Sequence, residues 1–217
     1  MKLAIFDLDE TLIAGDTASL WLEFLVRRKL APVGILEQER TLMTAYYQGR
    51  MDMDAYMALT LAPIRHWQLQ DLSPLVEEFI RQDILPLVYP DARARLAWHR
   101  SQGHEIVIIS ATGEHLVKPI ALALGVRHAI GIMLDCCDGV YNGRTRGVFS
   151  YQEGKLVRLQ EWLERQALSP SHSYGYSDSL NDLPLLEFVD TPFAINPGEH
   201  LAHIARGRNW SCLNWEL

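Results

Sequence analysis

Near its start the chain reads Phe6-Asp7-Leu8-Asp9-Glu10-Thr11-Leu12, at the end of the apolar run 3–6. An unbroken apolar run is typical of a short strand that is buried on both faces of a sheet. Asp7 and Asp9 fall where this strand ends, and open α/β sheets bind ligands at that edge. Because the two acids are two residues apart, extended backbone points both side chains the same way, so one carboxylate can be a nucleophile while the other moves protons. Taken alone, the pair is equally explained if one aspartate caps the following turn and the other is simply exposed to solvent.

The composition is that of an ordinary globular protein and argues against several classes. Of the 217 residues, 48% are hydrophobic and 22% are charged, and the formal net charge is −7. Nucleic-acid binders carry a basic face, which this acidic balance disfavours, although a local basic pocket for one phosphate stays open. The three cysteines form no CxxC pair and fit reduced thiols in the cytoplasm. No signal-peptide core and no run of about 18 apolar residues is present, so we expect a cytoplasmic protein without a membrane partner.

Hydrophobic periodicity divides the chain into an inserted helical region and an α/β core. The region 16–85 lacks strand-like alternation and predicts four helices. These are a helix capped by Asp16 or Thr17, one from Pro32 through Tyr47 to Gly49, one from about Asp52 or Asp54 to Pro63, and one from about Ser73 to Leu85. From residue 86 onward helix and strand patterns alternate, which implies a parallel sheet with helices on both faces. We therefore predict a doubly wound α/β core formed by 1–15 and 86–217, with 16–85 as a separate helical domain.

A second acidic cluster, Asp178-Ser179-Leu180-Asn181-Asp182, follows the strand-like run 173–177. Magnesium prefers oxygen ligands from one or two carboxylates, water and substrate phosphate. Adjacent parallel strands bring Asp7 and Asp178 together, and the two carboxylates then predict a magnesium site. The cluster taken alone is also explained as a helix cap.

Two further segments supply groups that can bind a phosphate. Ser110-Ala111-Thr112-Gly113 comes at the end of the apolar strand 105–110 and opens a helix, so its hydroxyls and backbone N–H groups form a candidate phosphate cradle. Lys155 begins a later helix and can neutralise phosphoryl charge. Taken alone, the segment Ser110–Gly113 has the features of any helix start, and Lys155 is equally explained as a solvent-exposed lysine. Lys118 is a rival cation, but it lies within a helix.

The order of these elements resembles the haloacid dehalogenase superfamily of phosphohydrolases over essentially the whole core. Asp7-Leu8-Asp9-Glu10-Thr11 matches the DxDxT signature of that superfamily, Ser110 its strand-end Ser/Thr, Lys155 its lysine, and Asp178 with Asn181-Asp182 its acidic motif. The helical region directly after the first motif is similar to the cap domain of the branch that contains phosphoserine phosphatase.

The resemblance implies a phosphatase with a role for each matching residue. Asp7 would attack phosphorus and form an aspartyl phosphate, and Asp9 would act as acid and then as base. Asp7, the backbone carbonyl of Asp9, and Asp178 would hold Mg²⁺. Ser110 and Lys155 would bind the phosphoryl group, and Asn181 and Asp182 would order the groups around the metal and Lys155. Thr112 and Gly113, from the candidate phosphate cradle, are further phosphate-binding candidates.

In this branch a carboxylate nine residues beyond the nucleophile helps to bind the ammonium group of the substrate. That position is Asp16 here, one methylene shorter than the glutamate expected for phosphoserine, and Asp16 is equally a helix cap. Histidinol phosphate and phosphoethanolamine also carry a cationic nitrogen, so we expect a small amine-bearing phosphorylated metabolite as the partner. Arg50 of the helical domain is a further candidate for substrate contact. Phosphoryl transfer to an alcohol is the alternative reaction, whereas the presence of both Asp9 and Asp178 disfavours carbon–halogen hydrolysis. A non-catalytic phosphate-binding module is the alternative from another class, although every catalytic position is filled, and the sequence leaves both a monomer and a dimer open.

Overall fold

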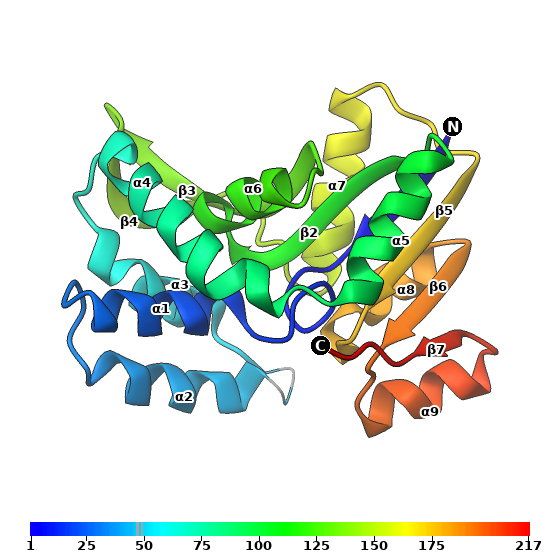
Figure 1. Ribbon diagram of the computed structural model, residues 1–217, viewed down its shortest axis with the longest axis horizontal. Helices are drawn as coiled ribbons and strands as arrows, with labels where there is room; N and C mark the ends of the chain where they lie inside the picture. The colour runs from blue at the N-terminus through cyan, green and yellow to red at the C-terminus, as the bar shows by residue number, and fades with distance from the viewer. Residues whose placement is uncertain (47, 49) are drawn as a thin grey trace.

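A computed structural model, which describes residues 1–46, 48 and 50–217, contains a seven-stranded sheet (Figure 1). In chain order the strands are β1 (Lys2–Phe6), β2 (Glu105–Gly113), β3 (His128–Cys137), β4 (Val140–Arg146), β5 (His172–Ser177), β6 (Thr191–Ile195) and β7 (Ser211–Leu213). They lie in the order β4-β3-β2-β1-β5-β6-β7, so β1 is the middle strand. All neighbours are parallel except β3 and β4, which form an antiparallel hairpin.

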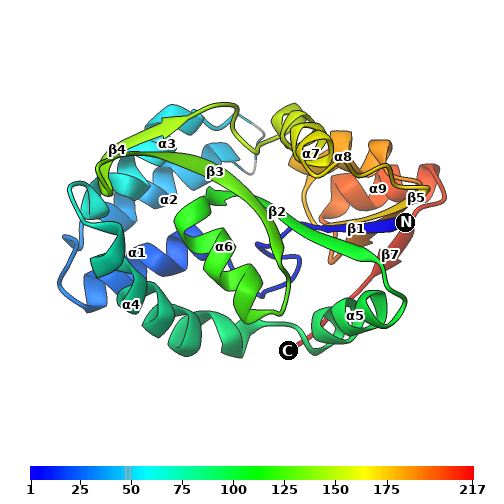
Figure 2. The same ribbon diagram turned by 90° about the horizontal axis from the view of Figure 1, so that it is seen from above.

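Helices cover both faces of this sheet, which confirms the doubly wound α/β fold predicted from the sequence. The helices of the core are α5 (Pro90–Ser101), α6 (Glu114–Ala123), α7 (Glu153–Arg165), α8 (Leu183–Phe188) and α9 (Glu199–Gly207). Figure 2 shows α5 and α6 on one side of the sheet and α7, α8 and α9 on the other. Leu3 and Ile5 of β1 pack with Trp162 of α7, whereas Ala4 and Phe6 belong to the cluster on the opposite face. Successive apolar residues in β1 are therefore needed because each face of the strand is buried.

Between β1 and α5, every regular element of the described chain is helical. This part of the chain forms α1 (Thr17–Arg27), α2 (Ile35–Tyr46), α3 (Met53–Leu61) and α4 (Leu69–Phe79), followed by a π-helical turn, Ile80–Ile84, and a 3-10 turn, Leu85–Leu87. Figure 1 shows these helices at one end of the molecule, beside the hairpin of β3 and β4 and away from β7. Tyr47 and Gly49, which we expected at the end of the second helix, lie outside the described residues. No helix in the described parts of the chain is long and apolar enough to cross a membrane.

Several element boundaries differ from those expected from the sequence. The second helix begins at Ile35 rather than Pro32, and the fourth begins at Leu69 and contains Pro74 in its second turn. Strand β2 continues past Ser110 to Gly113, because a register shift beyond Ile109 lets it stay paired with β3. Strand β7 was not anticipated. Its three residues are too short a run to give a periodic signal.

A buried histidine joins α5 to the sheet. His99 is fully buried; its Nε2 lies 2.8 Å from the Tyr176 hydroxyl, and its Nδ1 lies 2.8 Å from Nδ1 of His104. Burial, reinforced by His104 and Arg95, lowers the pKa of His99 to about 3. The fold therefore accepts His99 only in its neutral form.

This histidine makes stability fall in acid. Between its ordinary pKa of 6.5 and its folded pKa of about 3, the unfolded chain binds a proton that the folded chain refuses. At about pH 5 this proton binding lowers the free energy of unfolding by at most ~2 kcal/mol, which corresponds to a Tm loss of roughly 5 °C. We predict that His99→Gln, which keeps a polar partner for Tyr176 but does not titrate, shows a smaller loss of Tm between about pH 7 and pH 5 than the wild type. His203→Gln, at an exposed site, is the control and should lose as much as the wild type; equal losses in all three proteins would contradict the assignment.

Candidate active site

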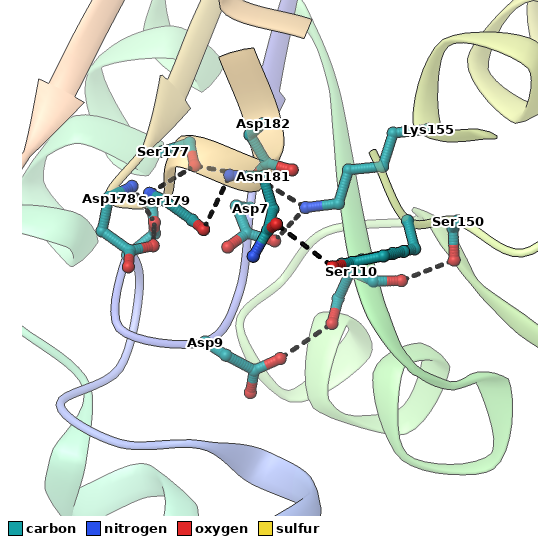
Figure 3. A network of polar contacts seen from close by, with 12 residues as sticks. Asp7, Asp9, Ser110, Ser150, Lys155, Ser177, Asp178, Ser179, Asn181 and Asp182 are labelled. Atoms are coloured by element: carbon teal, nitrogen blue, oxygen red, sulfur yellow. Dashed lines mark hydrogen bonds and ion pairs between the residues drawn. The ribbon is translucent and has the colours of Figure 1, made fainter. Parts of the chain in front are cut away.

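Three adjacent strands bring the predicted site residues to one edge of the sheet. Phe6 of β1 pairs in register with Ile108 of β2 and with Tyr176 of β5. The residues that follow these three positions therefore emerge side by side at the carboxyl ends of the strands. Figure 3 shows the side chains that meet there, contributed by β2, the end of β5, the segments after β1 and β5, the loop before α7 and the start of α7.

A lysine lies between two carboxylates at the centre of this edge. Lys155 Nζ is 2.7 Å from Asp7 Oδ1 and 2.7 Å from Asp182 Oδ2, and none of the three residues is more than 5% exposed. Ser177 donates a further hydrogen bond of 2.7 Å to Asp182 Oδ2. Burial lowers the pKa of Lys155, but attraction to Asp182 and Asp7 outweighs it, so the pKa is raised and the ammonium stays charged. Burial raises the pKa of Asp7, and Lys155 opposes this by favouring the carboxylate.

The backbone before Lys155 explains how the lysine reaches this position. A Cβ on Gly154 would lie 2.0 Å from the carbonyl oxygen of Phe149, so only glycine lets the first turn of α7 pack against this loop. Gln152, just before the helix, has a φ of 49°, in the left-handed region. The tight turn fixes the start of α7 and therefore the direction in which the side chain of Lys155 points from the helix.

Asp9 is held by groups from the helical region and from β2. Its Oδ1 accepts a hydrogen bond of 2.7 Å from the backbone N–H of Thr17, at the start of α1. Its Oδ2 accepts bonds of 2.8 Å from the Ser110 hydroxyl and 3.0 Å from the Thr112 hydroxyl. Ser110 and Thr112 are thus brought to the site, but here they bind Asp9.

Ser110 is fixed from a second direction by a residue that the sequence did not reveal. The hydroxyl of Ser150, which is fully buried, donates a hydrogen bond of 2.6 Å to the carbonyl of Ser110. Gly113 faces elsewhere: a Cβ there would meet the ring of His115 at 2.7 Å. The glycine thus makes room for His115 behind the strand. No pattern in the sequence marks Ser150, because its role depends on a contact across 40 residues.

Asp178 lies beside the first motif through a hydroxyl. Thr11 donates to Asp178 Oδ1 at 2.7 Å and accepts from the Asp178 backbone N–H at 3.0 Å. Burial, together with nearby Asp182 and Glu10, raises the pKa of Asp178 to about 7. Repulsion from Asp178 also contributes to the raised pKa of Asp7. Carboxylates that repel one another in this way suit a bound cation. No group of three His, Cys, Asp or Glu side chains in the described residues is arranged to hold a metal, so an ion here must take further ligands from the backbone, water or substrate.

Asn181 connects the acidic loop to two other segments. Its Oδ1 accepts hydrogen bonds of 3.2 Å from the Tyr151 hydroxyl and 3.2 Å from Gln152 Nε2. Its Nδ2 donates a longer bond of 3.4 Å to the carbonyl of Tyr46 at the end of α2. Asn181 and Asp182 are therefore both at the site, as expected, while Tyr151 and Gln152 had no signal in the sequence.

A cavity of about 690 Å³ opens on these residues, and its charged lining is acidic. It is lined by Asp9, Glu10, Asp16, Tyr46, Gln48, Asp178, Ser179, Leu180, Asn181, Asn196, Gly198, Glu199, His200 and Leu201. Five of these side chains are carboxylic acids, and none of the described lining residues is lysine or arginine. The lining thus favours a ligand that brings positive charge next to its phosphate.

Asp16 and Arg50, the two candidates for substrate contact, lie in different surroundings. Asp16 caps α1, where its Oδ1 accepts 2.8 Å and 2.9 Å hydrogen bonds from the backbone N–H and the hydroxyl of Ser19. It also lines a smaller pocket that contains Asp9, Met43 and Tyr46. Arg50 is exposed, donates a hydrogen bond to Gln48, and does not line either pocket in the described chain.

Comparison with known proteins places the chain in a family. The model of the haloacid dehalogenase-like hydrolase family matches residues 4–187. A protein of Neisseria meningitidis serogroup C named histidinol-phosphatase is 36% identical over 220 residues, which cover 99% of each chain. A protein of unknown function from Bordetella pertussis Tohama I is 35% identical with a TM-score of 0.90, over 98% of this chain and 97% of that one. A substrate-bound phosphoserine phosphatase has the same fold at 15% identity, with a TM-score of 0.70 over 98% and 92% of the two chains.

The chain belongs to the haloacid dehalogenase-like hydrolase family. The family predicted from the sequence is thereby confirmed, as is the enzyme class, a phosphatase.

The Gly154 contact gives a test of the site's construction. We predict that Gly154→Ala displaces the start of α7, lowers stability by about 1–3 kcal/mol and reduces phosphatase activity at least tenfold, because Lys155 no longer reaches Asp7. Thermal melting and steady-state kinetics measure the two effects. Gly207→Ala is the matched control, since nothing lies within 4 Å of a Cβ there, and it should leave both properties unchanged. Wild-type activity in Gly154→Ala would show that the glycine does not position Lys155.

Proposed function

We propose that this phosphatase hydrolyses the phosphate monoester of a small, amine-bearing metabolite, with Asp7 as the nucleophile and Asp9 as the acid and base. The observation that carries the proposal is the contact of Lys155 with Asp7. A buried ammonium 2.7 Å from the carboxylate opposes the rise in the pKa of Asp7 that burial causes, and it adds positive charge where a phosphoryl group would bind.

The two acids divide the chemistry between them. An oxygen of Asp7 forms a bond to phosphorus as the bond from phosphorus to the leaving oxygen breaks, and Asp9 gives its proton to that oxygen. Asp9 then takes a proton from a water molecule, whose oxygen attacks phosphorus and releases phosphate and the free Asp7 carboxylate. The hydrogen bonds to Asp9 from Thr17, Ser110 and Thr112 support this assignment, because they hold its carboxyl in one orientation.

Magnesium is the cofactor that the donors at this site suit. The carboxylates of Asp7 and Asp178 and the backbone carbonyl of Asp9 would hold it, with water and substrate phosphate completing the oxygen ligands. When bound, Mg²⁺ neutralises the charge of the phosphate. Thr11 orients Asp178 for this task, and Asp182 and Asn181 keep Lys155 and the acidic loop in place.

Ser110, Thr112, Gly113 and Lys155 are the proposed phosphate ligands. Lys155 already faces the site, whereas the hydroxyls of Ser110 and Thr112 must turn from Asp9 toward the phosphate or bind both. Gly113 would contribute its backbone N–H, and a larger residue could not replace it because the ring of His115 fills the space that a Cβ would need.

We assign residues 16–85 to a cap domain and residues 1–15 and 86–217 to the catalytic core. Two contacts support a cap that closes over the site: the N–H of Thr17 binds Asp9, and Asn181 reaches the carbonyl of Tyr46. A closed cap would exclude water other than the attacking molecule and would contact the leaving group.

Histidinol phosphate fits the cavity better than phosphoserine. Both carry a cationic nitrogen that acidic residues such as Asp16 and Glu199 can attract, but phosphoserine also carries a carboxylate, and no described lysine or arginine lines the cavity to pair with it. The name of the Neisseria relative, histidinol-phosphatase, points the same way. Phosphoethanolamine, an amine without a carboxylate, is the second choice.

A substrate panel tests this order. With Mg²⁺ present, we predict that kcat/KM falls from histidinol phosphate to phosphoethanolamine to phosphoserine, with at least a tenfold difference between the first and the last, since an unpaired carboxylate in an acidic cavity is repelled. Phosphate release measures the rates. A preference for phosphoserine would contradict the assignment of the substrate, and inactivity on the whole panel would contradict the function.

Substitutions at the site test the mechanism. We predict that Asp7→Asn, which cannot attack phosphorus, lowers kcat by about 10⁴-fold or more on any substrate, including an aryl phosphate. Asp178→Asn should keep some activity but require a higher Mg²⁺ concentration, and EDTA should inactivate the wild type reversibly. Turnover by Asp7→Asn close to that of the wild type would exclude Asp7 as the nucleophile, and EDTA insensitivity would exclude the metal.

A further inference from the structure

A second carboxylic acid lies behind Asp16, and neither the proposed function nor the sequence motifs involve it. Glu39 of α2 is only 5% exposed, although glutamate is rarely buried without a partner. Its Oε1 is 2.5 Å from the hydroxyl oxygen of Ser19, and that same oxygen is 2.9 Å from Asp16 Oδ1. Ser19 therefore bridges two carboxyl groups, one at the wall of the substrate pocket and one behind it.

The position of Glu39 follows from the geometry of α2. Met43 and Tyr46 come four and seven residues after Glu39, so the three side chains share one face of the helix. Met43 and Tyr46 line the pocket next to Asp16 and Asp9. Glu39 lies on this face one turn before Met43, and within the described residues it reaches Asp16 through Ser19.

Hydrogen counting fixes the state of the bridge. The Ser19 hydroxyl has one proton to donate, so it can satisfy only one of two ionised carboxylates. The second short contact is a hydrogen bond only if that carboxyl carries a proton and donates it to the Ser19 oxygen. The chain of contacts from Asp16 through Ser19 to Glu39 therefore holds one carboxyl proton and one negative charge.

The N-terminus of α1 decides which acid keeps the negative charge. Asp16 is the N-cap and accepts the backbone N–H of Ser19 at 2.8 Å, which favours its ionised form, as does the helix dipole. No backbone N–H of the described residues donates to the carboxyl group of Glu39. Burial, with a smaller contribution from Glu23, raises the pKa of Glu39, although the hydrogen bond with Ser19 and the charge of Arg40 partly oppose the rise. Burial and the nearby carboxylate of Asp9 raise the pKa of Asp16 to about 7. Both pKa values are raised, so each acid binds a proton more readily than it would in water.

We propose that Glu39 is a positioning residue for substrate binding: as a neutral acid it donates to Ser19, and Ser19 in turn donates to the carboxylate of Asp16. Both hydrogen bonds to Asp16 then use Oδ1, and Oδ2 has no hydrogen bond to any described residue. That oxygen can accept a hydrogen bond from the cationic nitrogen of the substrate. The inference rests on the proposed function, because it assumes that Asp16 binds an amine.

Substitutions at Glu39 separate a neutral donor from a negative charge. Glu39→Gln keeps a donor to Ser19 without a charge, whereas Glu39→Leu and Ser19→Ala break the bridge. We expect the two bridge-breaking variants to raise KM for histidinol phosphate about tenfold, the effect of a lost hydrogen bond near a charged group, with kcat/KM for an aryl phosphate unchanged. Glu39→Gln should behave as the wild type does on both substrates. Glu37→Gln, an exposed site on the same helix, is the control.

The outcomes distinguish this inference from the proposed function. An unchanged KM in Glu39→Leu and Ser19→Ala, or a Glu39→Gln variant as impaired as Glu39→Leu, would overturn the inference while the wild type still hydrolyses histidinol phosphate. A wild type that is inactive on histidinol phosphate would overturn the function instead. Infrared spectroscopy gives a readout that does not depend on activity: at about pH 6 the wild type should show a protonated-carboxyl stretch that Glu39→Gln lacks, and its absence from the difference spectrum would also overturn the inference.

Discussion

Lys155 and the two carboxylates beside it form the contact on which the arrangement of the site depends. Its charge is buried, so it is tolerated only because Asp7 and Asp182 both lie 2.7 Å away. Those acids follow β1 and β5, and the lysine begins α7, so the ion pairs join three separate parts of the core. Gly154, which allows the tight turn before Lys155, is part of the same constraint. A phosphate bound at this edge would contact the same lysine that neutralises the buried charges of Asp7 and Asp182.

The helical region is connected to this centre through polar contacts with Asp9 and Asn181 and through Asp16 at the start of α1. One N-cap residue can thereby do two things, because capping uses Oδ1 and leaves Oδ2 for a ligand. The acidic cavity supports the proposal that the substrate carries a cationic group: Asp16 of the helical region and acids of the core, such as Glu199, would supply the negative charge that attracts it.

The sequence predicted those parts of the molecule that are encoded locally. The apolar run before Asp7, the alternation after residue 86 and the spacing of Asp7, Asp9, Ser110, Lys155 and Asp178 were enough for the fold class and for the residues that gather at the sheet edge. Contacts between distant segments left no such pattern. Ser150, Tyr151 and Glu39 act through partners 20 to 40 residues away, and short polar residues in loops look alike whether or not they have such a partner. Strand β7 and the extension of β2 depend on neighbouring strands, so periodicity alone did not indicate them.

The central claim is that Asp7 carries the phosphoryl group during turnover, and rapid acid quenching tests it most directly. The enzyme is mixed with histidinol phosphate and Mg²⁺, quenched in acid within one turnover, digested, and analysed by mass spectrometry. The account predicts that the peptide containing Asp7 gains the mass of one phosphoryl group, that fragmentation places the group on Asp7, and that Asp9→Asn accumulates more of it because the water is no longer deprotonated. A substrate that is hydrolysed at full rate while Asp7 is never phosphorylated, or a phosphoryl group on another residue, would contradict the account.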